Sequence, residues 1–405
     1  METHIIDRLG ARGDGVAPGP LYAPFTLPGE RVEGATEGDR ILSARIVTAS
    51  TERRPPPCLH FGQCGGCALQ HASDPFVAAW KRDQIAERLA AAGVTPGEIR
   101  QTETSPPGSR RRAAFTARRT KKTVEVGFLA RASDHIIPIE NCEILLPALM
   151  AARHAIADLA RIGASRKGPI KATATASETG LDLSVEGGKP PDRQLTTTLA
   201  DIATHHDLAR LAWNGEVVVE ARAPYHVMGE AQVTPPPGGF LQASRHGEET
   251  LTAAAREALG KVSRIADLFS GCGAFTLPFA RDAEIHAVEA DPALLSALKE
   301  GWRKVGGLKR VETEARDLFR RPLIGDELGK LDGLVIDPPR AGAKAQSEAI
   351  AKDGPPVIAA ISCDPATFAR DARILAAGGY RLDWVLPVDQ FRWSAHIELA
   401  ARFSR

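Results

Sequence analysis

Aromatic side chains are scarce in this sequence, and long hydrophobic runs are missing from it. Phe, Trp and Tyr make up 5% of the 405 residues, which argues against a protein built mainly on aromatic platforms for base stacking. No apolar run reaches the roughly 18 residues that a membrane-spanning helix needs. The first ten residues have no apolar core of the kind found in secretion signals, so we expect a cytoplasmic protein.

Net charge is also nearly absent. The 51 Lys and Arg are balanced by 50 Asp and Glu, which leaves a formal charge of +1. A nucleic-acid partner would therefore be held by local basic patches rather than by the field of the whole molecule. Residues 109–122 form such a patch, with seven basic residues and no acid. In a strand, alternation would place several of them on one face as a track for RNA phosphates. The alternative is an ordinary solvated face.

Cysteine is present but unevenly spaced. There are six, at positions 58, 64, 67, 142, 272 and 363. A chain long enough for two or three domains has sufficient core without disulfides. Three of the six lie within ten residues, which predicts a metal or cluster loop in a reducing compartment.

Turn signals and linkers divide the chain into three predicted domains. Residues 1–54 carry turn signals about every eight residues, with a strand expected over 41–47, and suit a small OB-type β-barrel. The alternative is an irregular arm. Residues 55–239 read as a mixed α/β domain that holds the cysteine loop. Within it, Asp74-Pro75 predicts the N-cap and first turn of a helix over 75–92, which could pack on the following domain.

Residues 240–405 alternate apolar strands with helices. The strands are expected at 265–269, 285–289, 334–337 and 357–362, and the helices at 275–281, 292–304 and 365–376. This alternation predicts a mainly parallel, doubly wound α/β sheet.

A candidate cofactor site follows the first of these strands. Gly271 and Gly273 allow the backbone to approach a ligand at the carboxyl end of the strand. Glu289 ends the next strand, where a carboxylate can accept hydrogen bonds from ribose hydroxyls. Asp317 follows the third strand and could reach an adenine amino group. An ordinary α/β turn is the alternative.

Two further strand ends carry reactive groups. Asp337 ends one strand and Cys363 another, so both should face the same crevice. The N-terminus of the helix after Cys363 would lower the pKa of the thiol, while Asp364 opposes this effect. A buried structural cysteine is the alternative. Near the C-terminus, Glu398 begins an otherwise apolar strand, where it either pairs with an arginine or serves as a base in the cleft.

Several of these motifs together resemble one enzyme family. "DLFSGCGAFTLPFA", "DPPRAG", "SCDPATFARD" and "HIELAARF", with "GGFLQAS" upstream, resemble the S-adenosylmethionine-dependent RNA uracil-5-methyltransferases. The spacing of the first three cysteines, with Cys142 in "IPIENCEIL", resembles the iron–sulfur branch that methylates 23S ribosomal RNA. The N-terminal segment looks like a short TRAM domain, an OB-like RNA-binding barrel. The fold this implies is a Rossmann-like methyltransferase domain preceded by the two smaller ones.

The resemblance implies a role for each matching position. Cys363 would be the nucleophile and Glu398 the base. The implied contacts of S-adenosylmethionine are Gln242, Phe269, Gly271, Glu289, Asp317 and Asp337. The implied ligands of a [4Fe–4S] cluster are Cys58, Cys64, Cys67 and Cys142. Zinc is the rival occupant, because four cysteines also make a closed zinc site.

The sequence departs from the family at three positions. Ala274 and Ser244 stand where the family often has Asn, and Asp364 replaces the usual Asn after the nucleophile. The resemblance implies a monomer that methylates C5 of a uridine, with transfer RNA as the alternative substrate. Two other functions stay open: methylation of an exocyclic amino group, which needs no nucleophilic cysteine, and a non-catalytic RNA-binding assembly factor.

Overall fold

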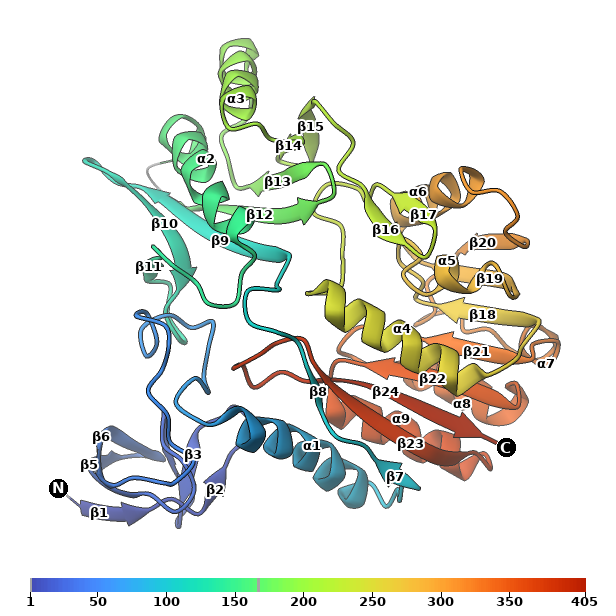
Figure 1. Cartoon of the computed structure of the whole chain (residues 1–405), viewed down its shortest axis with the longest axis horizontal. Coiled ribbons are helices and arrows are strands. Elements are labelled where there is room, and N and C mark those ends of the chain that lie inside the picture. The colour runs from blue at the N-terminus through green and yellow to red at the C-terminus, as the bar shows by residue number, and fades with distance from the viewer. Residues whose placement is uncertain (1, 166–167) are drawn as a thin grey trace.

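The N-terminal part of the chain is a curled, mostly antiparallel sheet. The structure is a computed structural model that describes residues 2–165 and 168–405 (Figure 1). The first sheet has six strands in the order β1-β5-β6-β4-β3-β2. Their bounds are β1 Glu2–Ile5, β2 Arg8–Leu9, β3 Gly15–Ala17, β4 Leu21–Ala23, β5 Arg31–Glu37 and β6 Arg40–Thr48. Strands β4 and β6 pair in parallel. Ile6, Val32 and Ile41 are buried inside the curl. This curled sheet fits the predicted barrel-type fold, and the irregular arm is not what the structure shows.

A seven-stranded sheet covered by two helices forms the middle part. The strand order is β11-β10-β9-β12-β13-β14-β15. The bounds are β9 Arg112–Arg119, β10 Val124–Leu129, β11 Ile136–Pro138, β12 Ile170–Ser177, β13 Gly180–Glu186, β14 Arg210–Trp213 and β15 Glu216–Glu220, with α2 Pro147–Gly163 and α3 Arg193–His205. Helix α2 packs on β9 and β10 and shares one apolar core with the sheet. A hairpin of β16 (His226–Met228) and β17 (Ala231–Val233) leads to the last part.

A nine-stranded sheet forms the C-terminal part. Its order is β20-β19-β18-β21-β22-β24-β23-β7, and β8 also pairs with β23. The strands are β7 Glu98–Ile99, β8 Glu103–Thr104, β18 Arg264–Leu268, β19 Glu284–Glu289, β20 Val311–Ala315, β21 Gly333–Ile336, β22 Val357–Ser362, β23 Arg381–Asp389 and β24 Glu398–Ser404. Strands β18 to β22 run parallel, whereas β24 is antiparallel to both of its neighbours. The predicted Rossmann-like α/β class is confirmed.

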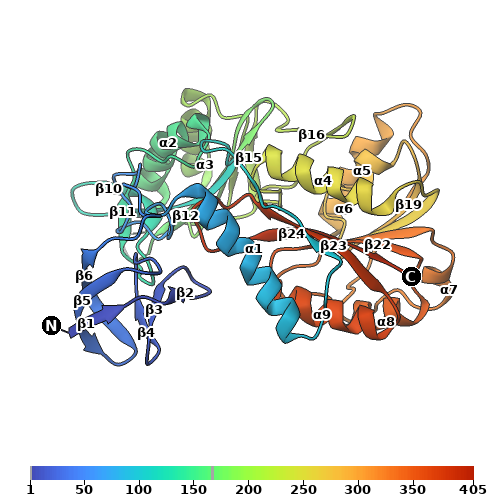
Figure 2. The same cartoon turned by 60° about the horizontal axis from the view of Figure 1, so that its bottom comes forward.

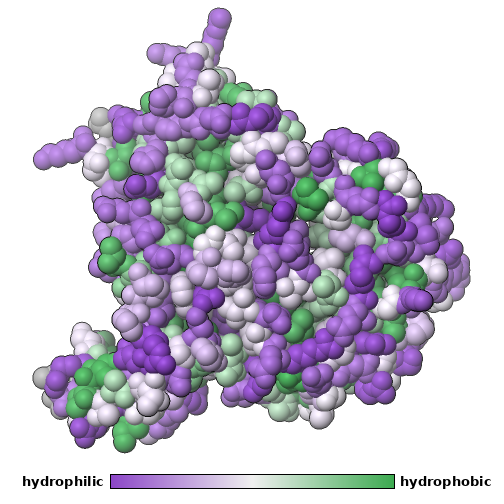
Figure 3. Space-filling view, in the orientation of Figure 1, coloured by the Kyte–Doolittle hydropathy of each residue, from purple (hydrophilic) through white to green (hydrophobic). Residues whose placement is uncertain are grey.

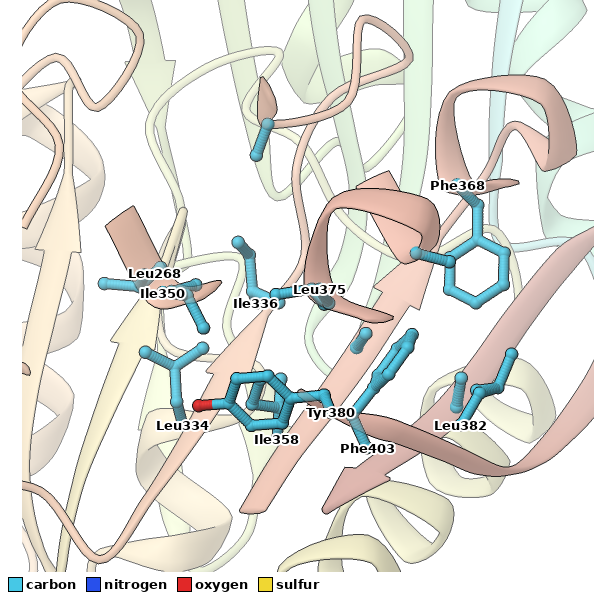
Figure 4. Packing of buried hydrophobic residues seen from close by; sticks show 14 of the residues in the cluster. Leu268, Leu334, Ile336, Ile350, Ile358, Phe368, Leu375, Tyr380, Leu382 and Phe403 are labelled. Atoms are coloured by element: carbon cyan, nitrogen blue, oxygen red, sulfur yellow. The ribbon is translucent and has the colours of Figure 1, made fainter. Parts of the chain in front are cut away.

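Helices cover both faces of this sheet. They are α1 Asp74–Ala91, α4 Arg245–Leu259, α5 Thr276–Phe279, α6 Pro292–Arg303, α7 Asp326–Gly329, α8 Lys344–Asp353 and α9 Pro365–Ala377. Helix α1 lies along α9, which packs on α8 (Figure 2), while α4 packs on β22 and β24. Figure 4 shows the apolar layer between the sheet and α8 and α9, where Leu334, Ile358 and Phe403 lie near Leu375 and Tyr380.

Three local predictions need correction. The N-cap of α1 is Ser73, whose side chain accepts a hydrogen bond from the Phe76 amide, and Asp74 is the first helical residue. The helix expected over 275–281 is limited to α5. Phe269 lies just beyond β18 rather than in it, because its φ of 62° turns the chain out of the sheet.

The surface in Figure 3 is largely hydrophilic, and its hydrophobic residues are scattered in small groups. Among residues 2–165 and 168–405, no helix combines the length and apolar character that crossing a membrane requires.

Candidate functional site

One cavity of about 550 Å³ lies at the carboxyl edge of the parallel strands. It is lined by the eight residues that the family resemblance implied as catalytic or cofactor-binding: Gln242, Phe269, Gly271, Glu289, Asp317, Asp337, Cys363 and Glu398. Gly273, the second glycine of the turn, does not line the cavity, and a Cβ atom there would lie 3.0 Å from the side chains of Leu277 and Leu298. The strand ends of a parallel sheet share one edge, which explains most of this convergence. Glu398 joins them because β24 runs the opposite way, so that its first residue lies at the same edge.

The turn after β18 is shaped to leave room for a ligand. Phe269 adopts a positive φ, a conformation that costs an ordinary side chain free energy and is concentrated at functional sites. Gly271 also has a positive φ, of 55°, and a Cβ atom there would point into open space. The Gly271 amide donates to Glu289 Oε2 at 3.1 Å, and the Ala290 amide donates to Glu289 Oε1 at 2.7 Å. These bonds hold the carboxylate at the rim of the cavity.

The groups around this turn fit an adenosyl cofactor. Phe269 and Phe319 place their ring centroids 5.5 Å apart at one wall, which offers apolar surface to a nucleobase. The Glu289 and Asp317 carboxylates supply acceptors for hydroxyl and amino groups. The buried Ser270 hydroxyl lines the same cavity and has no hydrogen-bond partner among the described residues. An orphaned polar group of this kind suits a ligand that carries its own polar atoms.

Cys363 lies in an acidic environment. Burial, together with the negative charges of Glu398 and Asp337, raises the pKa of its thiol to about 11, while Arg340 acts to lower it. The expectation that the following helix N-terminus lowers this pKa is therefore wrong. Desolvation and nearby negative charge outweigh the helix end, whose first amides are already bonded to Asp364. The free protein holds Cys363 as a thiol near neutral pH.

The two carboxyl groups beside Cys363 also have raised pKa values. Glu398 is 4% exposed. Burial and the charge of Asp337 raise its pKa to about 8, while a hydrogen bond from Gln390 lowers it. Burial and Asp267 raise the pKa of Asp337 to about 7. Glu398 is bonded to the Gln390 amide rather than to an arginine. Carboxyl groups that titrate near neutrality are suited to moving protons.

Sequence reasoning missed Gln390, which joins Glu398 to Gln242. Its Nε2 donates to Glu398 Oε2 and, at 2.6 Å, to Gln242 Oε1. Gln242 Nε2 in turn donates to Asp337 Oδ2 at 3.4 Å. A polar residue just after the apolar strand β23 was the only available signal.

The cysteines Cys58, Cys64, Cys67 and Cys142 line a second cavity, of about 220 Å³. All six cysteines of the chain are free thiols. Burial raises the pKa of Cys67 to about 12, and it also raises those of Cys64 and Cys142. Bound iron or zinc would instead lower the pKa values of these thiols, because metal binding deprotonates thiols.

The four thiols surround a space rather than converge on one point. Within the described part of the chain, no group of three or more His, Cys, Asp or Glu is placed to hold a metal ion. The volume of this cavity is several times the roughly 30 Å³ that one water molecule occupies in the liquid. Thiols around such a space fit a multi-atom group better than a single ion.

The basic run 109–122 is only partly a surface. The side chains of Arg111 and Arg112 point into the protein, where they bond to Glu248 and to the Gly238 carbonyl. Arg110 lines the cysteine cavity. The predicted phosphate track is therefore wrong over 110–112. The remaining basic side chains lie at the far end of the β9–β10 hairpin: Arg118, Arg119, Lys121 and Lys122.

The positions that depart from the family have local explanations. Ser244 caps α4, where its hydroxyl accepts from the Gly247 amide at 2.9 Å. Asp364 caps α9, where its carboxylate accepts from Ala366 and Thr367. Both residue types are strong N-caps. Ala274 lines the larger cavity without a polar atom.

The chain is similar to curated proteins over almost its whole length. A protein of Rhizobium meliloti, described as an uncharacterized RNA methyltransferase, is 45% identical over 412 residues, which cover 100% of this chain and 99% of that one. A 23S rRNA (uracil(1939)-C(5))-methyltransferase of Chromohalobacter salexigens is 34% identical over 427 residues, which cover 97% of this chain and 87% of that one. No family model matches the chain.

Among solved structures, the chain resembles a tRNA (uracil-54, C5)-methyltransferase of Pyrococcus abyssi in complex with S-adenosyl-L-homocysteine. The TM-score is 0.77 at 20% identity, and the match covers 99% of each chain. At that identity the likeness shows a shared fold.

Proposed function

The chain belongs to a family of S-adenosylmethionine-dependent RNA methyltransferases that includes a uracil-C5 enzyme, and from that premise we propose that it methylates C5 of a uridine in 23S ribosomal RNA. The meeting of Cys363, Glu398 and Asp337 in one cavity with the Gly271 turn supports this proposal most directly. The 34% identical relative acts on 23S rRNA, which favours that substrate over transfer RNA.

Uracil C5 needs activation before it can accept a methyl group. In the proposed reaction, Cys363 Sγ attacks C6, and the electrons of the C5–C6 double bond move to O4 to form an enolate. C5 then bonds to the methyl group. S-adenosylmethionine, when bound, supplies that methyl as an electrophilic sulfonium substituent. Glu398 takes the proton from C5, and the electron pair of that C–H bond re-forms the C5–C6 double bond while the bond between C6 and sulfur breaks and releases Cys363.

The acidic surroundings of Cys363 bear on the first step. The thiol must lose its proton before it attacks, and the ionised Asp337 carboxylate, which lines the same cavity, can accept that proton and leave Glu398 free for the C5 proton. A carboxylate that has received that proton no longer repels the thiolate. We therefore infer that the thiolate forms as the base enters and not in the free enzyme.

The target base must be unstacked to reach this cavity, at a cost of a few kcal/mol in base-flipping enzymes. Arg340 and His396 lie at the mouth of the cavity, with 3.4 Å between Arg340 Nη2 and His396 Nδ1. An exposed guanidinium at that place is suited to a phosphate of the target nucleotide.

The cysteine cavity has a structural role in this proposal. Cys58, Cys64, Cys67 and Cys142 would hold a [4Fe–4S] cluster, with zinc as the rival occupant. Methyl transfer requires no net electron exchange, so we assign the cluster no step in the reaction.

The test is methylation of separated rRNA and tRNA pools, followed by mapping of the modified nucleotide. We expect methyl incorporation at C5 of one 23S rRNA uridine. Cys363→Ser should abolish incorporation; full activity in that variant would instead favour an amino-methyltransferase. Cofactor binding without incorporation into any RNA would favour a non-catalytic assembly factor.

Glu398→Gln addresses the proposed base separately. Because proton removal would stall after thiol addition, we expect this variant to accumulate a covalent protein–RNA adduct on denaturing gels. Normal turnover by Glu398→Gln would remove Glu398 from the mechanism.

A further inference from the structure

Gln390 sits at the centre of the polar groups that line the reaction cavity, although it does not line the cavity itself. Its side chain is 2% exposed and contacts Glu398, Gln242 and the backbone of Ser244. No role was expected for it from the sequence.

The orientation of the Gln390 amide is fixed by chemistry. The Ser244 N–H can only donate, so the atom that faces it, at 3.3 Å, must be the Gln390 oxygen. The Gln390 NH2 group therefore faces Glu398 and Gln242. Because that NH2 can only donate, Gln242 must present its own oxygen to it, which turns the Gln242 NH2 toward Asp337.

The backbone around Gln390 is clamped on both sides. Lys81 of α1 forms an ion pair with Asp389, with 2.6 Å between Nζ and Oδ1, and both side chains are almost fully buried. The same Lys81 Nζ donates to the Phe391 carbonyl at 3.3 Å, and the Phe391 amide donates to Asp389 Oδ1 at 3.1 Å. Residues 389 and 391 are thus held from α1.

The side chain of Gln390 is also clamped by close packing. A Cβ atom on Gly247 of α4 would lie 2.7 Å from Gln390 Oε1 and 2.8 Å from Gln390 Cβ. Atoms cannot approach so closely, so the Gln390 side chain or helix α4 would have to move. Only glycine at position 247 leaves the Gln390 amide where it is.

We propose that Gln390 is a positioning residue for methyl transfer, which holds the Glu398 carboxylate in place as acceptor of the C5 proton and fixes the orientation of the Gln242 amide. The proposal rests on the proposed function of Glu398. Nothing in the mechanism requires Gln390 to touch the base or the cofactor, so its effect is exerted through its two partners.

Loss of the Gln390 donor should change the titration of Glu398. The groups that face Glu398 in the cavity are Asp337 and Cys363, with Arg340 and His396 at the mouth. Asp337 raises the pKa of Glu398, and the Gln390 hydrogen bond lowers it. Removing that bond should raise the pKa, so that less of the base is ionised at neutral pH.

The experiment compares Gln390→Met with Gln346→Met. Methionine keeps the length of the side chain and removes the amide. Gln346 is an equally buried amide that bonds to the Leu323 backbone, outside the cavity. Both variants lose a buried amide, so a merely structural effect should appear equally in both.

We expect Gln390→Met to move the acid limb of the kcat profile to higher pH. Because the ionised fraction of the base falls, kcat at neutral pH should be about tenfold lower for every pH unit that the limb moves. The KM for RNA should change less than kcat, and the covalent adduct should accumulate during turnover. Gln346→Met should lower thermal stability without moving the acid limb or the adduct level.

Gly247→Ala gives a second route that leaves the amide chemistry intact. It should displace Gln390 and move the acid limb in the same direction, and it serves as the test if Gln390→Met does not fold. An unchanged acid limb and adduct level in Gln390→Met or Gly247→Ala, beside an active wild type, would overturn the positioning role alone. An inactive wild type, or normal turnover by Glu398→Gln, would overturn the proposed function instead.

Discussion

At the residue scale, the surroundings of Cys363 oppose the ionisation that its proposed role as a nucleophile requires. A nucleophilic thiol usually lies beside positive charge, yet this one lies among carboxylates that raise its pKa. The arrangement suits a thiol that is kept protonated until its substrate arrives. It protects the thiol from oxidation and alkylation in the free enzyme, because thiolates are the reactive form.

Alkylation of Cys363 should report this environment. With a thiol pKa of about 11, its alkylation rate in the wild type should rise through roughly pH 7–10 without a plateau, since the rate follows the thiolate fraction. Ionised Glu398 raises that pKa, so Glu398→Gln should lower it. Alkylation near pH 9 should then be about tenfold faster if the pKa falls by about one. The Cys363 peptide would be quantified by mass spectrometry.

The matched control is Glu348→Gln, which removes an exposed carboxylate of α8 and should leave the rate unchanged. A plateau near neutral pH, or slower alkylation in Glu398→Gln, would contradict the assigned environment.

The candidate site was predictable from sequence only where chain order determines geometry. Glu289 ends β19, Asp337 and Cys363 directly follow β21 and β22, and parallel strands bring such ends to one edge. Gln390 and Gln242 are separated by 148 positions, and their contact depends on how α4 and the residues before it pack on β23 and β24. A single sequence carries no signal for that packing. The thiol pKa was also unpredictable, since it depends on which side chains surround Cys363.

At the scale of elements, helix α1 is tied to the catalytic sheet. It packs along α9 and β23, and its Lys81 reaches the end of β23 through a buried ion pair with Asp389. Burial lowers the pKa of Lys81 and raises that of Asp389, while their mutual attraction opposes both shifts. Neither charge is easily accommodated there without the other.

Lys81→Met should therefore destabilise the protein strongly. Removing one partner of a buried ion pair costs about 3–5 kcal/mol, because the other is left without compensation. Urea unfolding would measure the loss, and Lys81→Met with Asp389→Leu should recover part of it.

Arg82→Met, one position along the same helix at a partly exposed site, serves as the control and should cost far less. Equal stability of Lys81→Met and Arg82→Met would show that the ion pair contributes little to holding α1.

Periodicity predicted some elements well and missed others. The apolar strand β22 matches its expected bounds and β19 begins one residue before the expected start, because short apolar runs between turns leave little choice. Helix α4 was not predicted, since its first turn holds Gly247 and several polar residues. The two-residue strands β7 and β8 join the sheet through β23, and segments so short have no periodicity to detect.

At the scale of the whole molecule, the cysteine loop and the catalytic cavity are physically connected. The amides of Ala68 and Leu69 donate to the Trp393 carbonyl at 2.8 and 2.9 Å. Trp393 lies between Gln390 and Glu398 in the chain. Arg110 lines the cysteine cavity, and its guanidinium lies 5.6 Å from the ring centroid of Phe391, which lines the catalytic cavity. Loss of order in the cysteine loop should therefore reach the catalytic segment.

Cys142→Ser and Cys363→Ser should separate the two cavities. If the four cysteines hold an iron–sulfur cluster, Cys142→Ser loses iron and visible absorbance and has a melting temperature lower by several degrees, on the order of 1 kcal/mol or more in stability. Cys363→Ser should keep its iron and lose methyl transfer. Colourless wild-type protein with one bound zinc would contradict the cluster assignment.

The three predicted domains correspond to three sheets of the structure, but the limits between them do not all follow the order of the chain. The barrel-type sheet and the Rossmann-like sheet are present. That the chain divides into separately folding domains at 54/55 and at 239/240 stays a prediction. Residues 98–104 show why sequence is a poor guide here, because β7 and β8 precede the middle sheet in the chain yet pair within the catalytic one.

The central claim is a transient bond between Cys363 and C6 of a uridine. RNA that carries 5-fluorouridine tests it most directly, because Glu398 cannot remove fluorine as a cation after the methyl group has been added. Incubation with S-adenosylmethionine should trap the enzyme on the RNA, and mass spectrometry of the digested complex should find a methylated fluorouridine on Cys363. A complex joined through another residue, or none in the presence of active wild-type enzyme, would contradict the account.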